Sequence, residues 1–228
     1  MRHERLRPLS SASLNASYGL DLSLTSLSSL KPRFQRNLRP LTGFLARAGV
    51  TANQVTIFAL CGSLGVGLTL IMGAGLPVLF GLLPVWLAIR MALSTIDGIL
   101  AQEHGQKSRL GAFLNEAGDI VSETSLYAPF AFVKPFGPDW TTTIVILLVA
   151  SEFAGLAGPL LGGTRRCDGP FGKSDRAIAF GLVGAWIAAV GTLPAEAKYL
   201  FPVFALLLAV TIAMRLCYAL AEGAVRPA

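Results

Sequence analysis

Charged residues are scarce in this chain. Asp, Glu, Lys and Arg make up 14% of its 228 residues, and hydrophobic residues make up 53%. An ordinary soluble domain carries roughly 25% charged residues. A soluble domain of this size would need more polar surface to cover its core. The composition therefore argues against a soluble domain and indicates an integral membrane protein.

Cysteine is also rare, and its copies form no motif. Cys61, Cys167 and Cys217 are scattered and show neither CxxC nor another metal-ligand spacing. This pattern argues against a zinc site and against a disulfide framework. We interpret all three as small buried hydrophobic residues.

Acidic residues are fewer than basic ones, which leaves a net charge of +6. The basic residues flank apolar runs, and this placement favours anionic lipid headgroups or a phosphorylated substrate over nucleic acid. A membrane span needs about 20 mostly apolar residues. The sequence shows no internal repeat, and we predict an all-α membrane protein with six spans, at residues 55–72, 78–100, 110–133, 141–161, 176–192 and 199–221.

The chain divides into three parts. Residues 1–29 are rich in Ser and Leu and lack the features of a secretory signal, so we expect a weakly ordered leader. Residues 30–48 combine basic residues with apolar ones at helical spacing, which predicts an amphipathic helix at the membrane surface. Residues 49–228 form the predicted six-helix transmembrane domain.

Lys and Arg lie mostly on one side of the predicted spans. They cluster before the first span, between the second and third, and between the fourth and fifth, whereas the opposite loops carry only Lys134 and Lys198. Because basic loops stay in the cytoplasm, we expect both termini there.

Polar residues gather where the second span ends and the third begins. Ser94 and Asp97 share one helix face, and Gly111, Asn115 and Asp119 share another. Ionisable residues inside membrane spans are costly and are therefore functional candidates. Because the two spans are consecutive and antiparallel, we expect their polar faces to meet. Such oxygen ligands suit Mg²⁺ or Mn²⁺.

At these positions the chain resembles the CDP-alcohol phosphotransferase family. The family signature is D-x-x-D-G-x-x-A-R-x8-G-x3-D-x3-D, and this chain reads S-x-x-D-G-x-x-A-Q-x8-G-x3-N-x3-D. Three positions depart from the signature: Ser94, Gln102 and Asn115. Asn53 and Thr56 match the family's N-x-x-T entry to its first helix. Gly172-Lys173 lies where the family often has a Gly-Lys loop before its fifth span.

The resemblance implies a specific activity. Family members bind a CDP-linked donor, often CDP-diacylglycerol, with divalent cations held by the Asp cluster. An alcohol attacks the lipid-bearing phosphate, and CMP leaves. The implied protein is a membrane transferase of phospholipid biosynthesis in a bacterial inner membrane, in contact with membrane lipids and forming a homodimer as family members often do.

Carried over residue by residue, Asp119 is the expected catalytic base and also a metal ligand. Asp97 is the best ligand for Mg²⁺ or Mn²⁺, while Asn115 and Ser94 offer weaker oxygens. With two carboxylates left, one tightly held ion, or a second recruited by the diphosphate, is expected. Glu123 can supply a missing negative charge. The expected substrate-binding residues are Gly98, Ala101, Gln102, Gly111, Asn53, Thr56, Arg165, Arg166 and Lys173.

Other readings of these residues stay open. Asp97 and Asp119 can simply join helices by hydrogen bonds, and basic loop residues can simply mark the cytoplasmic side. We expect Glu152 to pair inside the bundle with Arg90 or Arg215. The departures leave room for a non-catalytic relative that binds lipid or nucleotide. A small cation transporter is a third alternative, although no pair of broken helices supports it.

Overall fold

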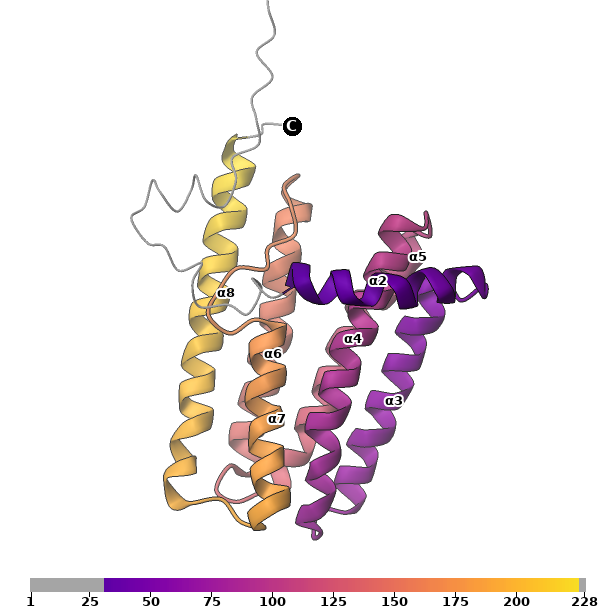
Figure 1. Ribbon diagram of the computed structural model, residues 1–228. Helices are drawn as coiled ribbons and strands as arrows, with labels where there is room; N and C mark the ends of the chain where they lie inside the picture. Colours follow the sequence, from indigo (N-terminus) through magenta and orange to yellow (C-terminus); the bar gives the residue numbers. More distant parts are fainter. Residues whose placement is uncertain (1–30, 226–228) are drawn as a thin grey trace, which may run out of the picture.

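The protein is a bundle of long helices, with one further helix lying across the bundle (Figure 1). The structure is a computed structural model that describes residues 31–225, so the leader predicted for residues 1–29 lies outside it. This part of the chain contains helices and no strand. The bundle helices are α3 (Ala52–Met72), α4 (Leu82–Glu103), α5 (Arg109–Tyr127), α6 (Gly137–Leu160), α7 (Lys173–Val190) and α8 (Leu200–Val225).

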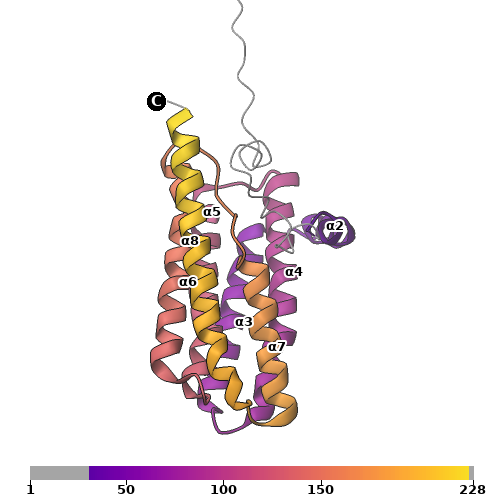
Figure 2. The ribbon, with the colours of Figure 1, turned by 90° about the vertical axis from the view of Figure 1, so that its left-hand side faces the viewer.

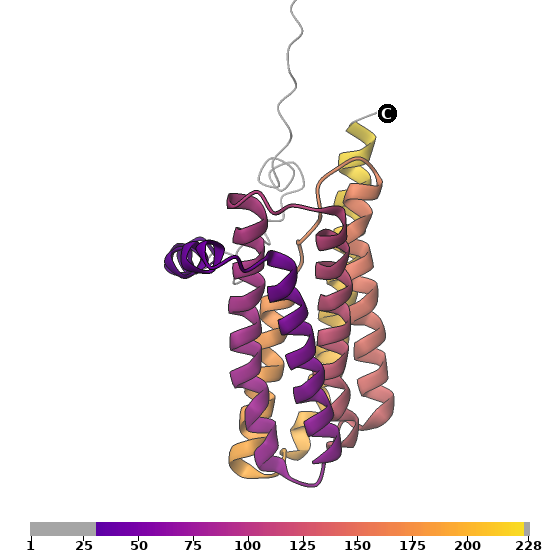
Figure 3. The same ribbon diagram turned by 90° about the vertical axis from the view of Figure 1, so that its right-hand side faces the viewer.

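The crossing helix is α2 (Lys31–Arg47), which lies at the end of the bundle where α3 begins (Figures 1 and 3). Arg39 of α2 forms a salt bridge of 2.9 Å with Glu103 at the end of α4. Phe44 of the same helix is exposed. An amphipathic helix with apolar side chains left uncovered has the form that a membrane-surface helix requires.

Four of the bundle segments are long and apolar enough to cross a membrane: Ala52–Met72, Pro77–Glu103, Gly137–Leu160 and Ala195–Gly223. The helices α5 and α7 are not among them. Acidic and amide side chains interrupt α5, and α7 is short and begins with charged residues. The described chain is therefore an all-helical protein with four candidate spans, and the six-span count stays a prediction.

The order of helix packing differs from the order in the chain. Helix α3 lies between α4 and α5 and packs against both (Figure 3). Helix α4 then packs against α7, α5 against α6, and α6 against α8. The polar faces of α4 and α5 were expected to meet directly. Instead α3 packs between the two helices, and the long side chain of Arg90 reaches from α4 to α5.

The end of the bundle away from α2 has an aromatic core. Three short 3₁₀ helices close this end: η3 (Pro77–Gly81), η4 (Ala128–Phe132) and η5 (Ala195–Tyr199). The rings of Phe136 and Phe201 stack at 3.9 Å, as do those of Tyr127 and Phe180. Phe130 packs edge-on against Phe180 at 5.3 Å. These rings form a dry core that joins α5, α7, α8 and η4.

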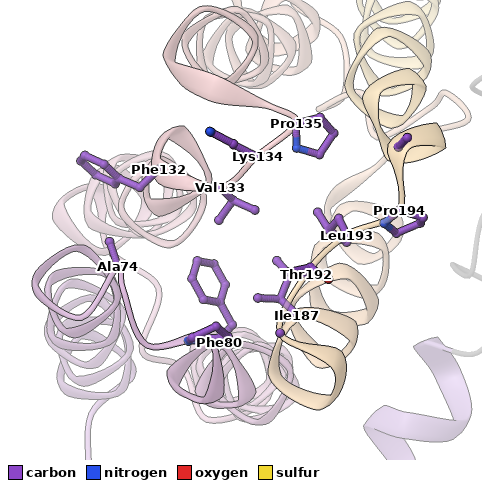
Figure 4. A pocket seen from close by; sticks show the side chains of 13 residues that line it. Ala74, Phe80, Phe132, Val133, Lys134, Pro135, Ile187, Thr192, Leu193 and Pro194 are labelled. Carbon is purple, nitrogen blue, oxygen red and sulfur yellow. The ribbon is translucent and has the colours of Figure 1, made fainter.

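A cavity of about 350 Å³ opens at the same end (Figure 4). Its lining is mostly apolar and includes Phe80, Val133 and Ile187, with Lys134 at one side. None of the predicted site residues lines it. The cavity therefore lies apart from the residues that the sequence assigns to chemistry.

Large apolar side chains cover the outside of the bundle. Phe58, Ile146 and Leu182 are each about 60% exposed or more. Our interpretation of the three cysteines as buried was wrong, because all three are exposed. In a helix that faces lipid, an apolar residue need not be buried in protein, so hydrophobicity alone does not predict its position.

Candidate functional site

Asp97 lies on α4 and is buried, with 7% of its surface exposed. The hydroxyl of Thr56 on α3 donates a hydrogen bond of 2.9 Å to the Asp97 carboxylate. Within the part of the chain that the structure describes, Asp97 forms no salt bridge. The charged side chains that act on it through space are Asp119 and Lys173. Asp97 is thus a buried carboxyl group without a cation in contact.

Asp119 on α5 differs from Asp97 because each of its oxygens contacts a cation. Arg90 of α4 donates to Oδ1 at 2.8 Å, and Lys173 of α7 donates to Oδ2 at 2.5 Å. Both oxygens of Asp119 therefore accept charge-assisted hydrogen bonds. Each oxygen keeps a further lone pair that can accept another hydrogen bond.

Alternating charges continue from Asp119 around the inside of the bundle. Lys173 contacts Glu152 at 3.3 Å, Arg176 contacts both Glu152 and Glu123 at 2.8 Å, and Glu123 lies 3.7 Å from Arg90. Together with the two contacts of Asp119 these pairs close a ring that joins α4, α5, α6 and α7. We call this the ion ring; its members are Arg90, Asp119, Lys173, Glu152, Arg176 and Glu123.

The expected partners of Glu152 are partly correct. Arg215 of α8 lies 3.6 Å from Glu152, as expected for a polar contact inside the bundle. Arg90 instead pairs with Asp119 and Glu123. Glu152 also contacts Arg165, so it is shared by several cations.

The other motif residues lie in different surroundings. Ser94 and Gln102 are exposed, Asn115 is half-buried, and Ala101 packs against a small apolar cluster formed by α3 and α4. Within the described residues, no three His, Cys, Asp or Glu side chains gather as a metal site. The assignment of Asp97, Asn115 and Ser94 as ligands of a divalent cation therefore stays a prediction.

Two glycines of the motif have contrasting surroundings. A Cβ atom added at Gly111 would come within 2.7 Å of Asn53 Oδ1, so this glycine allows α5 to approach α3. A Cβ atom added at Gly98 would meet no atom within 4 Å. Packing within this chain therefore explains why residue 111 is a glycine, but it does not explain the glycine at position 98. The space beside Gly98 is open to a ligand.

The predicted N-x-x-T entry lies beside the motif. Thr51 caps the start of α3 through a capping box with Gln54. This cap fixes the first turn of α3, which carries Asn53 towards Gly111 and Thr56 towards Asp97. Both residues thus touch motif positions, and in this structure they contact protein groups.

The loop from α6 to α7 carries Arg165 and Arg166, and Lys173, the third basic residue expected to bind substrate, begins α7 directly after it. The loop descends beside α8, so α7 begins lower in the bundle than the tips of α4, α6 and α8 (Figure 2). The hydroxyl of Thr211 on α8 accepts a 3.1 Å hydrogen bond from the backbone N–H of Phe171. Gly169, at φ +116°, lies so close to Thr211 that a side chain would collide with it. These contacts hold the first residue of α7, Lys173, below the ends of α4, α6 and α8.

The three basic residues do not share one environment. Arg165 pairs with Glu116 at 2.6 Å, and about a third of its side chain is exposed. Arg166 is buried and pairs with Asp168 and Glu222, which holds the loop to α8. Lys173 belongs to the ion ring. Of the three, Arg165 is the most open to a ligand.

Sequence reasoning missed the role of Arg176. Its position at the start of a span suggested an ordinary basic flanking residue, yet its side chain is fully buried between Glu123 and Glu152. The only signal in the sequence was the number of acidic residues inside predicted spans. Because a buried acid needs a cation, Glu123 and Glu152 implied buried basic partners without naming them.

Sequence comparison finds relatives among membrane enzymes and membrane proteins. No family model matches the chain. The chain is 47% identical to the inner membrane protein YnbA of Escherichia coli over 167 residues, which cover 72% of this chain and 81% of that protein. It is 32% identical to the phosphatidylinositol phosphate synthase of Mycobacteroides abscessus over 116 residues. That match spans about half the length of each chain.

The fold is similar to solved structures of the Mycobacterium tuberculosis phosphatidylinositol phosphate synthase. The structure with CDP-DAG bound has a TM-score of 0.66 at 20% identity, over 81% of this chain and 94% of that one. The structure in complex with manganese and citrate has a TM-score of 0.64 at 20% identity, over 83% and 92% of the two chains.

The helical bundle has the fold of these synthase structures, and Asp97 and Asp119 stand at the spacing of the CDP-alcohol phosphotransferase signature. With the motif spacing and the relatives above, the chain belongs to the CDP-alcohol phosphatidyltransferase family.

Proposed function

We propose that this protein transfers a substituted phosphate, in the form of a phosphatidyl group, from a CDP-linked lipid to an alcohol and releases CMP. The observation that carries the proposal is the pair of motif acids. Asp97 is a buried carboxyl group without a cation in contact, and the Asp119 carboxyl group lies within electrostatic range of it. A buried carboxyl group without a protein cation is costly to ionise, so such a group is kept where a cation or cationic complex binds.

The donor would bind beside α4. The space next to Gly98 admits a ligand close to the helix backbone, and Asp97 lies next to Gly98 in the chain. Asp97, with Asn115 and Ser94 as weaker oxygens, would hold a divalent cation. Bound there, Mg²⁺ or Mn²⁺ neutralises charge on the diphosphate and holds it for in-line attack.

Asp119 would receive the proton of the acceptor alcohol. The hydroxyl donates a hydrogen bond to a free lone pair of Asp119, and its oxygen attacks the lipid-bearing phosphorus. A new oxygen–phosphorus bond forms, the bond to the CMP oxygen breaks, and the hydroxyl proton passes to Asp119. Arg90 and Lys173 would hold the carboxylate of Asp119 in position while it accepts the proton. CMP leaves with the electron pair of the broken bond.

Basic residues suggest how the acceptor alcohol binds and how the protein lies in the membrane. Arg165 is a basic side chain beside the ion ring that is open enough to bind an anionic group on a substrate. We place the α2 end of the bundle at the cytoplasmic surface of a bacterial inner membrane, where α2 lies among the headgroups and both termini are cytoplasmic. Association as a homodimer is part of the same proposal.

The direct test is product formation. Purified protein receives CDP-diacylglycerol, Mg²⁺ or Mn²⁺, and a panel of labelled alcohols that includes glycerol phosphate, serine, inositol phosphate and choline. We expect CMP and one labelled lipid to form in equal amounts. An Asp119→Asn variant should lose both products, while Asp139→Asn, which changes an acid at the other end of the bundle, should retain them. Binding of the donor without CMP release from any acceptor would identify a non-catalytic relative instead.

A further inference from the structure

One ion pair beside the ion ring can open without disturbing the bundle. Arg165, in the loop between α6 and α7, contacts Glu116 of α5 at 2.6 Å, and both side chains are partly exposed. Glu123 and Glu152 of the ion ring are by contrast buried. A partly exposed ion pair contributes little to stability, because water solvates each partner when the pair opens. Arg165 and Glu116 can therefore separate at low cost.

Arg165 has hydrogen-bond donors to spare. Its contacts to Glu116 and to Glu152 are both made by one nitrogen, Nη2. Its Nε atom is buried and has no hydrogen-bond partner in the part of the chain that the structure describes. A buried donor without a partner is costly. Glu152 is also shared by three other cations, so it compensates only part of the charge of Arg165. Arg165 therefore has the charge and the donors to bind a further anionic group.

Glu116 lies beside the residues that the motif assigns to chemistry. It directly follows Asn115 and comes three residues before Asp119 on α5. Asp119 and Lys173 both lie within electrostatic range of it. Among the described residues, Arg165 is the one cation that Glu116 contacts. An anion that binds to Arg165 must therefore meet the carboxylate of Glu116, because the two compete for one guanidinium group.

We propose that Glu116 determines acceptor specificity: it occupies Arg165 in the empty site and gives way when a substrate brings an anionic group. The inference rests on the proposed function, because it concerns the acceptor of that reaction. A phosphorylated alcohol has to displace Glu116 from Arg165, whereas a neutral alcohol does not. Glu116 thus lowers the affinity for phosphorylated acceptors relative to neutral ones.

The first test measures anion binding and does not depend on turnover. Full-length protein in a non-ionic detergent is titrated with inorganic phosphate, without divalent cations, and binding is followed by phosphorus NMR. We expect weak binding to wild type and about fivefold tighter binding to Glu116→Gln, the size expected for a partly exposed charge contact. Equal or weaker binding to Glu116→Gln would overturn the inference, as would the absence of phosphate binding in every variant.

Two further variants separate competition at Arg165 from a general effect of charge. Arg165→Met should abolish the gain when it is combined with Glu116→Gln, and Arg165→Gln serves in its place if that protein does not fold. The matched control is Asp168→Asn, which removes an acid that pairs with Arg166 in the same loop. Phosphate affinity should change by less than about twofold in this control. A gain that persists without Arg165, or an equal gain in Asp168→Asn, would refute the role of Glu116.

The second test compares acceptors in turnover. The alcohol that wild type uses is paired with its counterpart with or without a phosphate group, and kcat/KM for CMP release is measured for both. Glu116→Gln should raise the ratio of phosphorylated to neutral acceptor about fivefold, and Asp168→Asn should leave it unchanged. A lower ratio in Glu116→Gln would show that Glu116 itself binds the acceptor and would overturn the inference. If no acceptor yields CMP, the proposed function fails, while the phosphate titration still decides the inference.

Discussion

The two ends of the bundle are held together by different chemistry. At the aromatic end, stacked and edge-on rings of five aromatic side chains and their neighbours fill a dry core. At the α2 end, the ion ring joins four helices through buried charges. Apolar packing is the less costly way to stabilise a bundle, because buried ion pairs seldom gain more than their desolvation costs. The use of charges at one end therefore indicates function there rather than stability.

The largest expected effect comes from breaking the ion ring. Arg176→Met leaves Glu123 and Glu152 buried with one fewer cation each. Removing one partner of a buried pair typically costs about 3–5 kcal/mol, and we expect a loss of that size in the free energy of unfolding. Denaturant unfolding in detergent measures it, with Lys198→Met at the aromatic end as the control. Equal stability of Arg176→Met and wild type would mean that the ring is not a structural unit.

The two motif glycines sharpen the comparison between packing and binding. Gly111→Ala should destabilise the protein by about 1–3 kcal/mol, because the new methyl group collides with Asn53. Gly98→Ala has free space on the protein side and a better helix former, so stability should be unchanged or up to about 1 kcal/mol higher. In the Gly98→Ala variant, binding of CDP should nevertheless weaken at least tenfold. Normal CDP binding by Gly98→Ala would remove α4 from the donor site.

Labelling of the loops tests whether the two ends of the bundle face different compartments. The loops that carry Lys107 and Arg165 should be cytoplasmic, while Lys134 and Lys198 should face outward. Cys61, Cys167 and Cys217 are first replaced, and single cysteines are then introduced at the four positions in intact cells. An impermeant reagent should label positions 134 and 198 only. Labelling of position 107 from outside would invert the proposed orientation.

The smallest effect is expected at the cavity of the aromatic end. Lys134 lines this cavity and precedes α6, whose ion-ring residue Glu152 lies about four helical turns after the first residue of the helix. Lys134→Met should change CDP binding and CMP release by less than about twofold. A tenfold loss of either, in folded protein, would assign a role in substrate handling to the cavity.

The sequence predicted the elements better than their arrangement. Apolar periodicity and the turn residues placed the helices within a few residues, and the motif acids Asp97 and Asp119 lie within electrostatic range of each other. The position of α3 between α4 and α5 could not be inferred, because adjacency in the chain does not determine which helices pack together. The burial of Cys61 and Cys217 was mispredicted because exposed and buried helix faces are both apolar in such a bundle, whereas Cys167 lies in the loop between α6 and α7.

The ion ring was also beyond sequence reasoning. Glu123, Glu152 and Arg176 are distant in the chain, and each is compatible with several partners. Only the descent of the α6–α7 loop, fixed by Gly169 and Thr211, places Lys173 and Arg176 at the depth of the acids. Long-range geometry of this kind leaves no periodic pattern in the sequence.

The most direct test of the account is whether Asp97 is the acid that binds the donor. CDP is titrated onto wild type, Asp97→Asn and Asp139→Asn with Mn²⁺ present, and binding is followed by calorimetry. We expect wild type and Asp139→Asn to bind alike and Asp97→Asn to lose at least a hundredfold in affinity, because the variant lacks the buried carboxyl group that would bind the cation. Equal affinity for CDP in wild type and Asp97→Asn would contradict the assignment of the donor site to this end of the bundle.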